Sequence, residues 1–148
     1  MNIAIASDHG GYALKRELMP YLEKLGYKLN DLGCENESSC DYPDFGIALA
    51  KAVANGEFER GILICGTGIG ISISANKVKG IRCALCTDAT MARLTREHND
   101  ANVLALGGRI VGAELAKDIA ATFLSTAFSG EERHQKRIDK ISKYESGL

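Results

Sequence analysis

The sequence has no surplus of charge of either sign. Lysine and arginine together number 18 and aspartate and glutamate 19, which gives a net charge of -1 at pH 7. A chain that binds a nucleic-acid backbone through charge carries a basic surplus or a basic segment, and this chain has neither. The balance argues against nucleic acid and anionic membranes as partners, and it favours an enzyme that acts on a small molecule.

Long hydrophobic runs are also missing. No stretch approaches the length of about 18 apolar residues that spans a membrane. The opening residues Met1–Asp8 have no basic segment and only a short apolar run, unlike a secretory signal. We therefore expect no membrane partner and a cytoplasmic location, where the five cysteines stay reduced.

The cysteines do not have the spacing of a complete metal site. Cys83 and Cys86 form one C-x-x-C pair, but no second pair exists to complete a zinc site. They lie in a segment, Ile81–Thr87, that predicts a strand, in which residues three apart face opposite sides of the sheet. This favours small buried hydrophobic residues over a redox or metal site, and we expect no metal.

Linkers, repeats and low-complexity segments are absent too, so residues 1–148 are expected to form a single domain. Apolar residues make up 45% of the chain and charged residues 25%, an ordinary globular composition. A domain of this length buries about 68–70% of the surface of its unfolded chain, which is enough for a core without disulfides.

Short apolar runs alternate with helical patterns along the chain. Strands are predicted at Asn2–Ala6, Tyr27–Leu32, Gly61–Cys65, Ile81–Cys86 and Asn102–Leu106. Helices are predicted at Tyr12–Leu25, Pro43–Asn55, about 71–77, Asp88–Asn99, Ala113–Ser125 and Glu131–Ser146. Pro20 should kink or break the first helix. The alternation predicts an α/β fold, a three-layer α/β/α sandwich with a Rossmann-like five-stranded parallel sheet.

Polar segments rich in glycine follow the first and third predicted strands. These are Ser7–Gly11 and Gly66–Gly70. We expect the first three strands in the order 2-1-3, which places both segments at one crevice beyond the carboxyl ends of the strands, where such sheets bind ligands. The order of the last two strands stays open.

The segment Cys65–Gly70 carries the strongest chemical signal. Its three glycines let backbone N–H groups converge at a helix N-terminus, which suits an anion or an oxyanion. A thiol beside such dipoles can serve as a base or nucleophile. The cysteine-phosphatase motif C-x5-R fails because its arginine position holds Ile71, and neither the Walker A loop nor G-x-G-x-x-G fits. A plain glycine-rich turn is the alternative.

Three other groups of residues could take part in chemistry or serve structure alone. Asp8 would cap a helix or, with His9, contact a ligand. His98 would cap a helix end at the surface or carry a proton. Arg133 and Arg137 lie one turn apart and repel each other by a few tenths of a kcal/mol unless an anion such as phosphate lies between them. The alternative for them is a solvated charged face.

Together these motifs resemble the type B ribose-5-phosphate isomerases, a family that includes galactose- and allose-6-phosphate isomerases. The resemblance covers essentially the whole chain. It rests on Ser7–Gly11, Asp41–Pro43, Cys65–Ser72, Ala75–Lys77, Arg96–Asn99, Gly107–Arg109, and the pair Arg133-His134 with Arg137. It implies an aldose–ketose isomerase of sugar phosphates without a cofactor, in a homodimer or tetramer whose active sites are shared between subunits.

The resemblance also implies roles for single residues. Cys65 would move the proton between C2 and C1, and Ile71 stands where other members carry a glutamate base, which points to the cysteine branch. His98 would open the sugar ring. The remaining implied contacts are Asp8 and His9 with the sugar, Gly66, Thr67, Gly68, Ile69 and Gly70 with the enediolate oxygen, Asn99, Arg109, Arg133 and Arg137 with the substrate and its phosphate, and His134 bordering that phosphate.

The chemistry agrees with ribose 5-phosphate and ribulose 5-phosphate as the substrate pair. Ring opening needs an acid, proton transfer needs a base, and the enediolate needs preorganised donors. Three alternatives remain: a hexose-6-phosphate isomerase of the same family, a sugar-phosphate-binding protein without activity, and a flavodoxin-like flavin or nucleotide binder.

Overall fold

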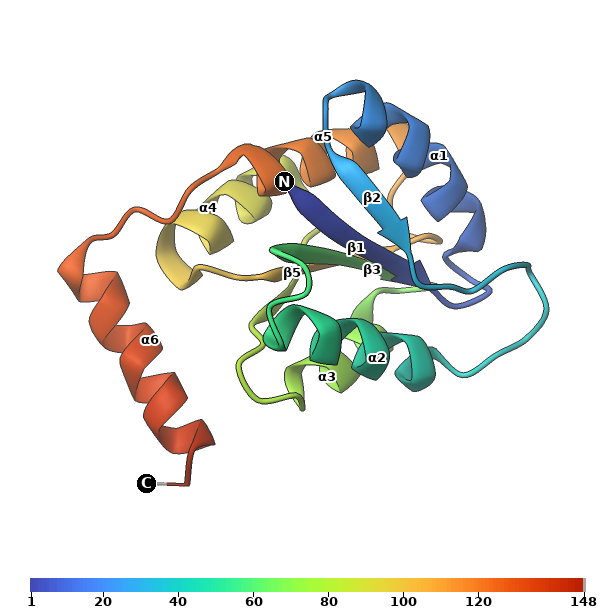
Figure 1. Cartoon of the computed structure of the whole chain (residues 1–148). Helices are drawn as coiled ribbons and strands as arrows, with labels where there is room; N and C mark the ends of the chain where they lie inside the picture. Colours follow the sequence, from blue (N-terminus) through green and yellow to red (C-terminus); the bar gives the residue numbers. More distant parts are fainter. Residues whose placement is uncertain (148) are drawn as a thin grey trace.

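Five parallel strands form one sheet between two layers of helices, as the computed structural model shows for residues 1–147 (Figure 1). The strands are β1 Asn2–Ser7, β2 Lys28–Asp31, β3 Arg60–Cys65, β4 Cys83–Leu85 and β5 Val103–Gly107. The helices are α1 Tyr12–Lys24, α2 Tyr42–Ala54, α3 Ile69–Asn76, α4 Ala89–Asn99, α5 Ala113–Ser125 and α6 Glu132–Glu145. The predicted α/β/α sandwich is confirmed.

The strand order is β2-β1-β3-β5-β4, so the predicted order of the first three strands is also confirmed. β5 lies between β3 and β4, and it pairs with β3 from Gly61↔Val103 to Cys65↔Gly107. All five strands run in the same direction. The segments that follow β1, β3 and β5 therefore lie side by side at one edge of the sheet.

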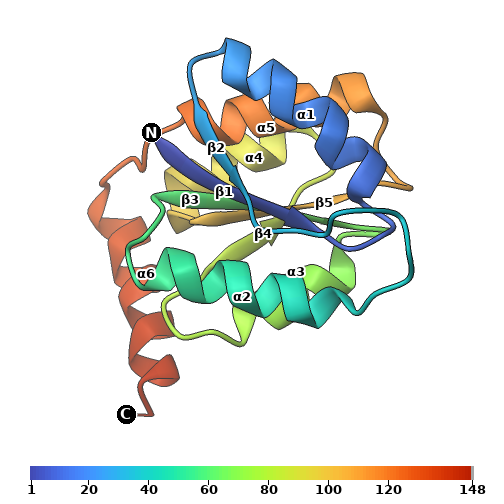
Figure 2. The ribbon, with the colours of Figure 1, turned by 45° about the vertical axis from the view of Figure 1, so that its right-hand side comes forward.

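Each face of the sheet has its own apolar core (Figure 2). One core lies under α1, α4 and α5 and contains Leu18, Ile64 and Phe123. The other lies under α2 and α3 and contains Leu63 and Ile71. Apart from Arg60 at the start of β3, the residues of β3 and β5 are buried on both faces, which explains their apolar sequences.

Two predictions about single elements are corrected. α1 continues through Pro20 without a break. Pro20 and the residue four positions earlier, Arg16, both lie on the exposed face of the helix, so the carbonyl that Pro20 cannot pair faces water. β4 is three residues long rather than six. The side-chain amides of Asn102 and Asn76 accept the N–H groups of Arg82 and Cys83, where ladder bonds would otherwise begin.

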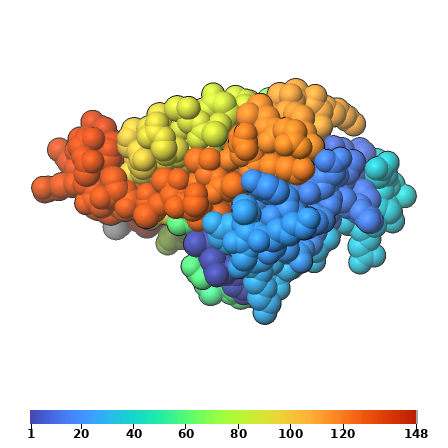
Figure 3. Space-filling model, turned by 90° about the horizontal axis from the view of Figure 1, so that it is seen from above, coloured from blue at the N-terminus to red at the C-terminus, as the bar shows by residue number. Residues whose placement is uncertain are grey.

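α6 stands apart from the rest of the chain and packs mainly against α4 (Figures 1 and 3). It leaves Ile141 and Tyr144 exposed, at 54% and 86% of their surface. A helix with large exposed apolar side chains and few contacts is suited to packing against a partner. None of the helices within residues 1–147 is long and apolar enough to cross a membrane.

Candidate active site

The loop after β1 holds Asp8 and His9 in fixed orientations. The Asp8 carboxylate is buried, and its Oδ1 accepts the N–H groups of Gly10 and Gly11 at 2.9 and 3.2 Å. The Nδ1 of His9 accepts the backbone N–H of Cys40 at 3.2 Å. In the neutral ring the proton is therefore on Nε2, which can donate to a ligand. Sequence reasoning missed Cys40, because only the folded loop brings it to His9.

Cys65 lies at the end of β3, and the glycine-rich loop wraps around its sulfur. Its Sγ accepts the N–H of Gly68 at 3.1 Å, and the residue is 4% exposed. Gly68 has a φ of 79°, and a Cβ there would meet the backbone of Leu106 and Gly107, so only glycine fits. The amino end of α3 thus points at the sulfur, as the sequence predicted for a site that holds negative charge.

The segment after β5 completes this edge. The N–H of Gly108 donates to the carbonyl of Cys65 at 2.8 Å, and the N–H of Arg109 donates to that of Gly66 at 2.9 Å. The Arg109 guanidinium lies over Gly66, where a Cβ would be 3.0 Å from its Nη1. The exposed Thr67 accepts the N–H of Ile69 at 3.2 Å through its Oγ1. We name the residues of this edge the loop half-site: Asp8, His9, Cys65, Gly66, Thr67, Gly68, Ile69, Gly70 and Arg109.

The other predicted residues lie at the opposite edge of the sheet. His98 and Asn99 end α4, which returns from the carboxyl end of β4 to the amino end of β5. The imidazole of His98 stacks on that of His134 in α6, with ring centroids 4.3 Å apart. We name the second group the helix half-site: His98, Asn99, Arg133, His134 and Arg137.

Within one chain the two half-sites do not meet. α4 has 11 residues, so its two ends are about 16 Å apart. Figures 1 and 2 agree that α6 lies at the side of the molecule opposite the loops after β1 and β3. Arg133 and Arg137 are exposed, and Arg133 forms an ion pair with Glu131. A single chain therefore does not assemble all of the predicted site residues around one ligand.

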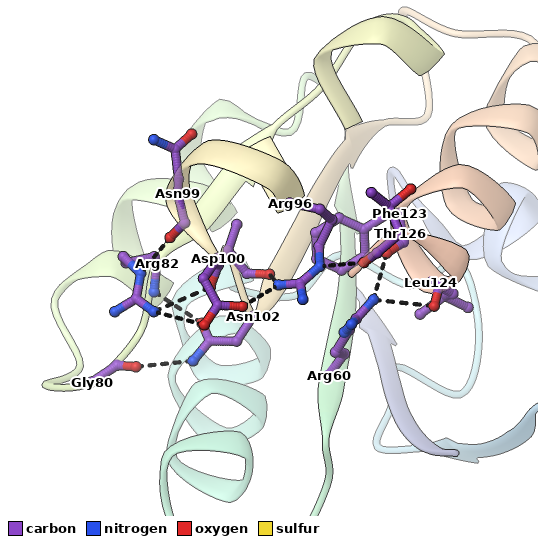
Figure 4. Close-up of polar contacts among 11 residues, drawn as sticks. Arg60, Gly80, Arg82, Arg96, Asn99, Asp100, Asn102, Phe123, Leu124 and Thr126 are labelled. Carbon is purple, nitrogen blue, oxygen red and sulfur yellow. Dashed lines mark hydrogen bonds and ion pairs between the residues drawn. The ribbon is translucent and has the colours of Figure 1, made fainter. Parts of the chain in front are cut away.

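Three arginines hold the helix ends at this second edge (Figure 4). Arg96 is buried; its Nε donates to the carbonyl of Thr126 at 3.0 Å, and its Nη1 donates to Asp100 Oδ1 at 2.8 Å and to the carbonyl of Ala101 at 2.6 Å. Arg82 donates to the carbonyl of Asn99 at 2.7 Å.

The third arginine, Arg60, donates to the carbonyls of Phe123 and Leu124 at the end of α5. Burial and the neighbouring Arg96 lower the pKa of Arg60. The arginines thus supply donors to carbonyls that helix ends leave without partners. Arg82 and Arg96 hold the end of α4 that carries His98 and Asn99, and Arg60 holds the end of α5. Sequence reasoning missed these roles.

Cys83, Cys86 and Ile71, which stands where other family members carry a glutamate, lie in surroundings that suit a structural role. Burial raises the pKa of Cys83 and of Cys86 to about 12, so neither is a thiolate near neutral pH. This supports the prediction of small hydrophobic residues. Ile71 is fully buried in the core under α3 and contributes no acidic group.

Comparison with known proteins identifies the family of the chain. A family model described as Ribose/Galactose Isomerase matches residues 3–141. The chain belongs to the ribose/galactose isomerase family. Among its relatives, ribose-5-phosphate isomerase B of Escherichia coli is 47% identical over 143 residues, which cover 97% of this chain and 95% of that protein.

Solved structures place the chain within the same family. A ribose-5-phosphate isomerase B from Clostridium thermocellum superposes with a TM-score of 0.97, at 57% identity and with 99% of each chain covered. The enzyme of the same name from Mycoplasma genitalium, solved with bound ribulose 5-phosphate, superposes with a TM-score of 0.93, at 44% identity. The match covers 99% of this chain and 97% of that one.

Arg96 is expected to matter for stability more than its neighbour on the helix surface. Arg96→Met leaves three buried or part-buried acceptors without their donor, so the free energy of unfolding should fall by about 3 kcal/mol. The control is Arg93→Met, which removes only an exposed ion pair with Glu97 and should change stability by less than about 0.5 kcal/mol. Urea unfolding measures both, and equal effects would contradict the role given to Arg96.

Proposed function

We propose that this chain is a ribose-5-phosphate isomerase that interconverts D-ribose 5-phosphate and D-ribulose 5-phosphate, a step of the pentose phosphate pathway. The observation that carries the proposal is the loop half-site: a buried thiol at a strand end that accepts the backbone N–H of Gly68, beside a glycine-rich loop over which the Arg109 guanidinium lies. Relatives that match nearly the whole chain bear the name ribose-5-phosphate isomerase B, and one was solved with ribulose 5-phosphate.

The active site forms between two copies of the chain in this proposal. The loop half-site of one subunit faces the helix half-site of its partner in a homodimer, which can pair further into a tetramer. Three observations support this: the half-sites lie at opposite edges of one chain, α6 stands apart, and its outer face is apolar at Ile141 and Tyr144. A groove of about 450 Å³ beside α6, lined in part by Arg82, Asn99 and Ile141, offers space for the partner.

The loop half-site supplies the base and the oxyanion donors. Cys65 takes the proton from C2 of the open-chain aldose and returns it to C1. The N–H groups of the Gly66–Gly70 loop, together with Thr67, hold the negative oxygen of the enediolate meanwhile. Preorganised donors of this kind are worth about 10²–10³-fold in rate each. Asp8 and His9 bind the sugar hydroxyls and ring oxygen, with His9 donating from Nε2.

The helix half-site supplies the acid and most of the charge. His98 protonates the ring oxygen and opens the furanose. Asn99 binds the substrate together with Arg109 of the loop half-site, and Arg133 and Arg137 bind chiefly the phosphate. Binding energy from the phosphate then holds the reacting carbons against Cys65. None of these steps requires a metal or cofactor, because the base, the acid and the oxyanion donors are all side chains or backbone groups.

The proposed function also predicts which sugar phosphate is the preferred substrate and where in the cell the protein acts. We expect the five-carbon phosphate to be turned over faster than allose or galactose 6-phosphate, with added EDTA making no difference and purified protein showing no flavin colour. Coupled assays on the three sugar phosphates measure this, and no turnover of any would favour a binding protein. The five free thiols support a cytoplasmic location, where thiols stay reduced.

Shared sites predict that two inactive variants restore activity in each other. Cys65→Ala lacks the base and His98→Asn lacks the acid, so each homodimer should be nearly inactive. In a mixed dimer, one of the two sites combines the intact Cys65 of one subunit with the intact His98 of the other. Random reassortment makes half of the dimers mixed, so the mixture should recover about a quarter of the parent activity.

The control for this experiment is the same mixture without prior dissociation, which should stay inactive. Subunits are exchanged by mild denaturation and refolding, and ribose 5-phosphate turnover is then measured. A mixture that stays inactive although mass spectrometry finds mixed dimers would place Cys65 and His98 in the same subunit's site.

The phosphate role of Arg133 and Arg137 predicts an effect on stability. A ligand that binds only the folded protein stabilises it, by about 1.4 kcal/mol at ten times its dissociation constant. Inorganic phosphate should therefore raise the melting temperature of the parent, and the double variant Arg133→Ala/Arg137→Ala should lose nearly all of this shift. The double variant Lys136→Ala/Lys140→Ala, which removes the same charge from exposed positions of α6, should keep it. A full shift in the arginine variant would place the phosphate elsewhere.

A further inference from the structure

His134 is a buried polar residue that the proposed chemistry does not use. It is 5% exposed, although it lies on α6, whose other polar side chains are mostly exposed. Its Nε2 is buried and has no hydrogen-bond partner within residues 1–147. A ring nitrogen buried without a partner is unfavourable, so its position needs a reason.

The face of the His134 ring provides that reason. It lies almost parallel to the ring of His98, at 16° and with the centroids 4.3 Å apart. The two residues come from different helices, α4 and α6, and these helices pack against each other. His134 is therefore a flat surface that limits the rotation of the His98 ring about its side-chain bonds.

The surroundings of His134 favour its uncharged form. The charged or titratable groups that act on it are His98 from α4 and Arg133 and Arg137 from its own helix. Burial and these three groups lower the pKa of His134. An imidazolium there would also bury an N–H without an acceptor.

The surroundings of His98 differ from those of His134. It lies in the last turn of α4, where the carbonyl end of a helix favours a cation. The face of a neutral aromatic ring also attracts a cation placed over it. Two imidazolium rings at this separation would repel each other, which adds to the preference of His134 for its neutral form.

We propose that His134 is a positioning residue for ring opening: its ring, stacked on that of His98, fixes the plane of the catalytic acid. The proposal rests on the acid role given to His98. It differs from a role in binding phosphate, because it acts through His98 and concerns ring opening alone.

Two reactions separate ring opening from proton transfer. Isomerisation of ribose 5-phosphate starts from a ring and needs the acid. Exchange of the C1 hydrogen of ribulose 5-phosphate with solvent deuterium starts from an open chain and needs only the base and the oxyanion donors. A residue that positions the acid affects the first reaction, whereas general damage to the site affects both.

The test replaces the flat ring with flexible side chains and then restores it. His134→Leu and His134→Met should lower kcat for ribose 5-phosphate about tenfold, since a small misorientation of a catalytic group has effects of this size or larger. Their KM and their deuterium exchange should stay within about twofold of the parent. His134→Phe, which restores a flat neutral ring, should return kcat to within about threefold.

Each contrary result has a definite meaning. An unchanged kcat in the Leu and Met variants, or a tenfold loss that remains in the Phe variant, would overturn the positioning role. A raised KM with unchanged kcat would assign His134 to the phosphate, and an equal loss of isomerisation and exchange would make it structural.

His98→Asn, measured in parallel, tests the proposed acid separately. It should lose isomerisation and keep exchange. If it keeps both reactions or loses both, the role of His98 fails whatever the His134 variants do.

Discussion

The shared direction of the five strands is the constraint on which the rest of the structure depends. A parallel sheet places every strand's carboxyl end at one edge, and each helix that follows must return to the other. Cys65 ends a strand and His98 ends a helix, so the topology alone keeps them apart. Rotation of side chains cannot bring the two together, because α4 alone spans about 16 Å between its start at the carboxyl edge and its end at the amino edge. This separation is the physical basis for proposing a site between two subunits.

The two half-sites differ in chemistry because one lies beside free backbone N–H groups and the other beside free backbone carbonyls. At the carboxyl edge, a helix begins beside the loop, so N–H groups are available to a negative oxygen, and the buried thiol takes one of them. At the amino edge, helices end, so free carbonyls are available and attract cations. Arg82 and Arg96 donate to these carbonyls directly.

Much of the fold and the loop half-site could be predicted from the sequence. Strong alternation of apolar runs and helical patterns gave the sandwich, and α5 has the predicted bounds Ala113–Ser125. The glycines around Cys65 and the polar residues after β1 indicated the crevice because both signals are local. The position of β5 beside β3, which places Arg109 over Gly66, could not be predicted from short segments of sequence. Both β4 and β5 are short apolar segments, and neither sequence indicates which of them pairs with β3.

The residues of the helix half-site were predicted from the sequence, but their position in the fold was not. Arg133 and Arg137 share a helix face in any structure, yet nothing in the spacing says that this helix leaves the body of the chain. Arg96 resembles an exposed helix residue in sequence, and only the folded chain shows it as a buried donor to two carbonyls and one carboxylate, one of them beyond the end of α5. Likewise, a histidine stack between two helices has no sequence pattern, because it depends on how the helices pack.

The anchoring of His98 follows from these observations taken together. The backbone beyond it is held by Arg82 and Arg96, and its ring is held by His134, whereas Cys65 is held by β3 and the loop after it. The proposed acid and the proposed base therefore depend on separate sets of contacts, at opposite edges of one sheet. A change in one set can impair ring opening while proton transfer continues, which a site built on a single loop would not allow. The fold thus permits each step to be adjusted by substitutions far from the other step's residues.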